Sequence, residues 1–161
     1  MTEKMIKDCI HEVLCGVNRE SALEFVAYLR ASNMVFEKGK GYWEDKLYWC
    51  IKYKDSYVCY ILIGNEEKPG PGPWIVWFVD DGSDCYNDFP LDEHMKKTAW
   101  KNIDLCANCG YCSGGTDKTI FGKEFNNVCL TPMRFTDPDI RTLELMKKIV
   151  EIRKNDIGLV R

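Results

Sequence analysis

The spacing of hydrophobic positions changes along the chain from a helical period to a strand period. Residues 3–15 place apolar side chains at helical spacing, and Gly16 is a natural stop; these side chains are Ile6, Cys9, Ile10, Val13 and Leu14. Residues 18–33 repeat the pattern behind Asn18, a favourable N-cap. The N-terminal part is therefore expected to be a helical hairpin.

Three runs rich in aromatic and β-branched residues follow, at 47–53, 57–63 and 74–80. Lys54, Asp55 and Ser56 make a short polar turn between the first two runs. A longer loop, 64–73, contains three prolines and three glycines and precedes the third run. This arrangement predicts an antiparallel meander.

The second and third runs are apolar at nearly every position, although a sheet with one wet face should alternate apolar and polar residues. We expect a sheet that is covered on both faces, with helices on both sides as the favoured arrangement. The alternative is an aromatic cup on one face that holds a ligand. The candidate ligand-binding residues are Trp49, Tyr60, Trp74 and Trp77.

The remainder of the chain predicts a helix at 91–101 and strand segments at 128–130 and 133–135. Asp137-Pro138 is expected to open a final helix, whose apolar stripe is Ile140, Leu143, Met146, Ile149 and Val150. The fold class is therefore α+β. We expect a single domain over 1–161, with a helical hairpin, a mainly antiparallel sheet of four or five strands and a long C-terminal helix.

Charge and hydropathy exclude several function classes. The formal net charge of −3 argues against nucleic-acid binding through bulk charge. No apolar run approaches the roughly 20 residues needed to cross a bilayer, and residues 1–8 lack the apolar core of a signal peptide. We therefore expect a cytoplasmic protein without membrane contact, in which the nine cysteines stay reduced. The simplest interpretation of Cys9, Cys15, Cys50 and Cys59 is that they are small buried hydrophobic residues.

The most specific chemistry lies in Cys106-Ala-Asn-Cys109-Gly-Tyr-Cys112. A C-x2-C-G turn directs two thiolates at one metal ion, and its glycine lets backbone amides point at the sulfurs. Cys112 follows at the same spacing, and Cys129 is available further along the chain. The sequence predicts one tetrahedral structural Zn²⁺ held by Cys106, Cys109, Cys112 and Cys129, with residues 106–129 as a cysteine-rich loop.

Three other interpretations of these cysteines stay open. An iron–sulfur cluster suits the x2 spacing, but the fourth cysteine and the proline of the ferredoxin run are missing after Cys112. A thiol redox switch needs only two neighbouring cysteines, but the helix and strand context of a thioredoxin site is absent. The cysteines are otherwise ordinary reduced thiols.

Other motifs do not support an enzyme. Of the two histidines, His11 and His94, neither lies in a nucleophile or metal motif. Residues 114–119 do not complete a phosphate-binding loop, because Thr116 stands where that motif needs lysine, and we expect a mobile loop there. The acidic stretch 80–84 fails the calcium-loop pattern and is expected to be a solvated turn.

The cysteine knuckle and the following segment 117–129, Asp-Lys-Thr-Ile-Phe-Gly-Lys-Glu-Phe-Asn-Asn-Val-Cys, resemble small bacterial proteins of uncharacterised function. Residues 41–49 and 151–156 resemble the same group. The resemblance spans most of the chain and implies a self-contained domain, but it implies no activity, cofactor or partner.

Two hypotheses of function follow. The favoured one is a non-catalytic binding or regulatory domain that holds a small apolar ligand or a protein partner on its aromatic-rich sheet. The alternative is a thiol-redox or metal-dependent enzyme centred on Cys106, Cys109 and Cys112.

Overall fold

The computed structural model describes residues 2–39, 48–64, 73–87, 89–108 and 114–160. The helices in this part of the chain are α1 (Thr2–Val13), α2 (Gly16–Ala31), α3 (Glu93–Lys101) and α4 (Ile140–Val160). The strands are β1 (Val35–Lys38), β2 (Tyr48–Tyr53), β3 (Ser56–Ile63), β4 (Trp74–Phe78), β5 (Ile103–Leu105), β6 (Thr116–Ile120) and β7 (Lys123–Thr136). The expected α+β class is confirmed.

The strands form one antiparallel sheet in the order β1-β2-β3-β4-β7-β5, and β6 pairs with the first half of β7. The meander β2-β3-β4 agrees with the three runs predicted from the sequence. The described part of the sheet has seven strands rather than four or five, because β1, β5 and β6 are short and lack a clear apolar pattern.

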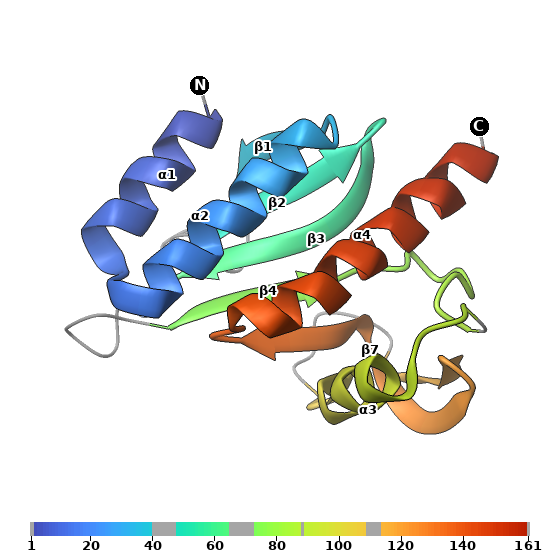
Figure 1. Cartoon of the computed structure of the whole chain (residues 1–161). Helices are drawn as coiled ribbons and strands as arrows, with labels where there is room; N and C mark the ends of the chain where they lie inside the picture. Colours follow the sequence, from blue (N-terminus) through green and yellow to red (C-terminus); the bar gives the residue numbers. More distant parts are fainter. Residues whose placement is uncertain (1, 40–47, 65–72, 88, 109–113, 161) are drawn as a thin grey trace.

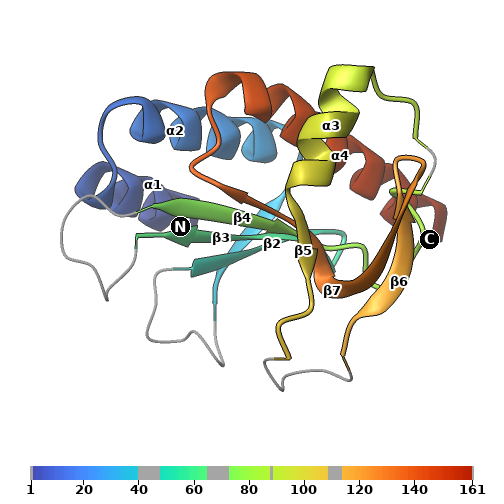
Figure 2. The same cartoon turned by 90° about the horizontal axis from the view of Figure 1, so that it is seen from below.

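The helices of the described residues all lie on one face of this sheet, so the expectation of helices on both faces is wrong (Figures 1 and 2). Strand alternation divides the apolar residues between the two faces. On β4, Trp74, Val76 and Phe78 are fully buried within the core cluster. Ile75 and Trp77 lie on the opposite face, which we call the helix-free face.

The core lies between the helices and the sheet and joins α2, β4 and β7. The ring of Phe25 on α2 lies 6.2 Å from that of Trp74 and 6.4 Å from that of Phe78. Phe78 in turn meets Phe135 of β7 edge to face at 5.7 Å. Such tilted and edge-to-face contacts are favourable aromatic geometries, so this cluster anchors the hairpin helix to the centre of the sheet.

The C-terminal helix packs on the same core. Leu143, Met146, Ile149 and Val150 are fully buried, as the apolar stripe predicts, whereas Ile140 is 41% exposed. Asp139, not Asp137, caps α4: its carboxylate accepts a hydrogen bond from the backbone N–H of Thr142 at 2.8 Å. The helix therefore begins two residues later than expected from Asp137-Pro138.

Asp137 has a different role, because it joins three separate segments. Its Oδ1 accepts hydrogen bonds from the backbone N–H of Trp74 at 2.9 Å and from Nδ2 of Asn18 at 3.1 Å. The residue thus ties the start of β4 and the first turns of α2 to the connection between β7 and α4.

Candidate functional site

Cys106 follows β5 directly and is held against β7. Its backbone N–H donates to the carbonyl of Asn127 at 2.8 Å. Its Sγ accepts the backbone N–H of Asn108 at 3.4 Å, and Asn108 adopts a left-handed φ of 56°. A backbone amide aimed at the sulfur from two residues further on is the local geometry expected for the first thiolate of a metal-binding knuckle.

Cys129 lies on the strand beside Cys106. Leu105 pairs with Val128, and the next pair along is Cys106 with Asn127. Cys129 lies two residues beyond Asn127 on β7, in a stretch where the pairing with β5 is irregular: Ile103 pairs with Met133 and Leu105 with Val128, and Asn127 has a left-handed φ of 60°. Its Sγ lies 3.5 Å from Oγ1 of Thr131. The two strands thus bring the first and last of the four predicted ligands into one neighbourhood.

The two middle ligands of the predicted site, Cys109 and Cys112, lie outside the described residues. Within the described ranges, no group of three or more His, Cys, Asp or Glu side chains is placed to hold a metal ion. The predicted zinc site therefore rests on the placement of Cys106 and Cys129 and on the spacing of the two cysteines between them.

The other cysteines differ in burial and in reactivity. Cys9 and Cys59 are buried as expected, whereas Cys15 is exposed, contrary to the expectation. Burial raises the pKa of the Cys9 and Cys85 thiols to about 11 each, and it also raises the pKa of Cys50 and Cys59. Because the thiolate is the reactive form, these four side chains are poor nucleophiles.

The sheet separates the four aromatic candidates. Trp49 and Trp74 are 2% and 0% exposed and belong to the core beneath the helices. Tyr60 and Trp77 lie on the helix-free face, directly opposite each other on β3 and β4. The four rings therefore do not line one pocket, and Tyr60 and Trp77 are the two that share a surface.

A continuous row of side chains crosses the helix-free face through this pair. The strand registers align Glu37, Cys50, Tyr60, Trp77 and Arg134, from β1 to β7. Tyr60 and Cys50 are half-buried, and Glu37 and Arg134 are exposed at the two ends. This row has an apolar, partly aromatic centre between an acidic end and a basic end.

A buried ionic cluster lies beyond the C-terminal end of β4. The sequence alone did not predict it. Asp80 is 3% exposed and forms an ion pair with Lys118 of β6. Arg153 of α4, also 3% exposed, donates to the carbonyl of Asp80 at 3.2 Å. Asp80 is therefore not solvated as expected, although Asp81, Gly82 and Asp84 of the same turn are exposed. The expected mobile loop at 114–119 is wrong, because residues 116–120 form β6.

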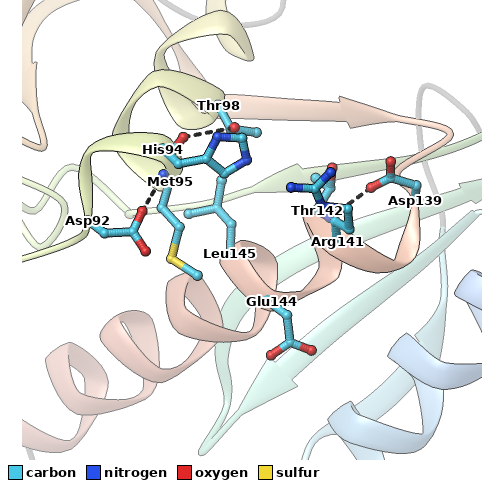
Figure 3. A pocket seen from close by; sticks show the side chains of 9 residues that line it. All are labelled: Asp92, His94, Met95, Thr98, Asp139, Arg141, Thr142, Glu144 and Leu145. Atoms are coloured by element: carbon cyan, nitrogen blue, oxygen red, sulfur yellow. Dashed lines mark hydrogen bonds between the residues drawn. The ribbon is translucent and has the colours of Figure 1, made fainter.

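A groove lies between the N-terminal halves of α3 and α4 (Figure 3). It measures about 420 Å³, and its rim carries the exposed side chains of His94, Arg141 and Glu144. The helix ends that face it are already capped. Asp92 accepts from the N–H of Met95 at 2.7 Å, and Asp139 caps α4. Since the lining residues offer no buried polar side chain to a ligand, we assign no function to this groove.

Comparison of the chain with models of protein families, with curated proteins and with solved structures gives no significant match. Among the described residues, no helix is both long and apolar enough to cross a membrane.

Proposed function

We propose that the chain is a non-catalytic binding or regulatory domain of the cytoplasm with one structural Zn²⁺. The ion is held by Cys106, Cys109, Cys112 and Cys129. The observation that carries the metal proposal is the N–H of Asn108 directed at the Cys106 sulfur, beside the strand that presents Cys129.

A structural zinc ion has a clear physical purpose at this end of the molecule. β5 has three residues that are all at least partly exposed, and β6 has five with mostly polar side chains, of which Ile120 alone is buried. A closed four-thiolate site contributes binding free energy directly to the folded state. Zinc is preferred over an iron–sulfur cluster because no cluster-type fourth cysteine follows Cys112 at short spacing.

The proposed binding surface is the helix-free face around Tyr60 and Trp77. Leu62 and Ile75, directly paired in the adjacent row, extend its apolar part. Apolar and aromatic side chains on one face suit a small apolar ligand or the apolar surface of a protein partner.

The metal proposal is tested by elemental analysis of protein purified from cells without added metal. We expect about one zinc per chain in the wild type and a large loss in Cys106→Ser and Cys129→Ser. Cys15→Ser is the matched control: this exposed cysteine lies outside the cluster, so the variant should keep its zinc. Less than about a tenth of an equivalent of any transition metal in the wild type would contradict the proposal.

The binding proposal is tested by tryptophan fluorescence during titration with a panel of small apolar molecules. A ligand on the helix-free face should change the emission of the wild type, and Tyr60→Ala should weaken its binding. Phe89→Ala, which removes an exposed ring, is the control. Turnover of a substrate that depends on Cys106 would instead favour a thiol-redox or metal-dependent enzyme.

A further inference from the structure

A separate cavity of about 340 Å³ lies beside the buried ionic cluster. It forms where β3 begins and β4 ends, next to the C-terminal half of α4, which passes over this edge of the sheet (Figure 1). Its lining residues are Ser56, Asp80, Asp81, Ser83, Arg153, Asp156 and Ile157. Two of the charged side chains in its wall, Asp80 and Arg153, are each only 3% exposed.

The positions of these side chains are fixed by hydrogen bonds from three directions. Arg153 donates through Nε to the carbonyl of Tyr57 at 3.0 Å and through Nη1 to Oδ2 of Asp156 at 2.8 Å. The same Oδ2 accepts the hydroxyl of Ser83 at 2.9 Å. These bonds hold both side chains in place, so Arg153 and Asp156 are joined by one hydrogen bond and not by two parallel ones.

Arg153 and Asp156 are therefore joined by one hydrogen bond, which leaves the NH₂ group at Nη2 of Arg153 and the Oδ1 atom of Asp156. Within the described residues, Nη2 of Arg153 has no acceptor and Oδ1 of Asp156 has no donor. Both residues line the cavity, and a guanidinium and a carboxylate each have the geometry for a two-bond interaction, so Nη2 can donate to a ligand and Oδ1 can accept from it.

The charges around the cavity select the kind of ligand. Three carboxylates, Asp80, Asp81 and Asp156, face two cations, Arg153 and the Lys118 that pairs with Asp80. The excess of one negative charge disfavours an anion. The guanidinium of Arg153 disfavours a cation beside it. The favoured ligand is therefore a neutral group that both accepts and donates hydrogen bonds.

We propose that this cavity binds a small molecule bearing a primary carboxamide. The amide oxygen accepts from Nη2 of Arg153, the amide N–H donates to Oδ1 of Asp156, and the apolar remainder lies against Ile157. The inference does not depend on zinc or on the helix-free face.

Three small probes of similar shape test the ligand class: benzamide, benzoate and benzylamine, which are neutral, anionic and cationic. Each is titrated into ¹⁵N-labelled wild-type protein, with the Nε–H of Arg153 and the backbone amides of 80–83 and 153–157 followed by NMR. Benzamide should shift these signals in a saturable way and bind at least about tenfold more tightly than either charged probe. Tighter binding of benzoate or benzylamine, or no saturable shift with benzamide, would overturn the proposal.

Asp156→Asn tests the role of the Asp156 carboxylate as the acceptor for the ligand. Its amide oxygen can still accept from Arg153 and Ser83, while an NH₂ group replaces the open acceptor, so benzamide binding should weaken about tenfold or more. Arg141→Lys, on the same helix but in the other groove, should leave the affinity unchanged. Unchanged affinity in a folded Asp156→Asn protein would also overturn the proposal, and if that variant does not fold, the wild-type probe series decides.

Discussion

Asp80 and Lys118 bury two opposite charges at the edge of the sheet, with side chains 4% and 11% exposed. The cost of removing these charges from water is offset by a dense set of contacts. The carboxylate of Asp80 also accepts the N–H of Gly82 at 3.1 Å, and the Lys118 ammonium donates to the carbonyl of Ser83 at 3.2 Å. The turn after β4 is thus tied to β6.

Lys118→Met should destabilise the protein by about 3–5 kcal/mol, because it leaves the Asp80 carboxylate buried without its partner. The double variant Asp80→Asn/Lys118→Met should recover part of this loss. Urea denaturation measures both values. Lys97→Met removes an exposed lysine and should stay within about 0.5 kcal/mol of the wild type. A similar small effect for Lys118→Met would mean that the ion pair contributes little.

The carboxylate of Asp139 makes a contribution to the stability of the folded protein that depends on pH. The backbone N–H of Thr142 is the main cause that lowers the pKa of Asp139 in the folded state. This carboxylate therefore stabilises the folded protein above its unfolded-state pKa of about 4, and the stabilisation is lost as the pH falls through the lower, folded-state pKa.

Asp139→Asn keeps a cap acceptor but removes the charge, so it should be less stable than the wild type by about 0.3–1 kcal/mol near pH 7. Urea melts at decreasing pH should show this difference shrinking as Asp139 becomes protonated. A difference that stays constant down to the acid limit of folding would argue against a role for the charge.

At the scale of elements, long apolar patterns were predicted well and short polar ones were not. Within the described residues, the run at 47–53 agrees with β2, and the run at 57–63 differs from β3 by one residue at one end, because both strands are apolar and meet at a polar turn. Lys54 and Asp55 in that turn have left-handed φ values of 49° and 66°. β6 was missed because its Thr-Asp-Lys-Thr sequence has no apolar alternation, and it exists through pairing with β7.

Alanine substitutions on α4 compare buried positions with an exposed position of the same helix. Leu143→Ala and Met146→Ala should each cost about 2–5 kcal/mol, because both side chains are fully buried and their truncation leaves cavities. Ile140→Ala, at a 41% exposed position of the same helix, should cost much less. Thermal melts of the three variants test this ranking, and equal effects at all three positions would contradict the assigned packing of α4.

At the scale of the whole molecule, one layer of helices covers the centre of the sheet, whereas the end with β5 and β6 is made of short strands with mostly exposed or half-buried side chains. The sequence identified the cysteines that we propose to secure this end. It could not show how the strands divide the aromatic residues, because that division depends on the registers of β2, β3 and β4. Nor could it bring Lys118 and Arg153 to Asp80, since these contacts depend on the tertiary fold.

Removal of zinc should therefore loosen one end of the sheet and leave the other intact. After treatment with a chelator, the amide of Cys106, which bonds to Asn127, should exchange its hydrogen faster. The amide of Val79, bonded to the carbonyl of Val58 at 3.0 Å, should remain protected. Added zinc should restore the original pattern, and identical exchange with and without chelator would contradict a structural role for the metal.

The most direct test of the zinc proposal is X-ray absorption at the zinc edge of the protein as isolated from cells, together with its metal content. The account predicts about one zinc per chain with four sulfur neighbours at about 2.3 Å. Nitrogen or oxygen atoms in place of two or more of these sulfurs, or less than about a tenth of an equivalent of zinc in the protein as isolated, would contradict it.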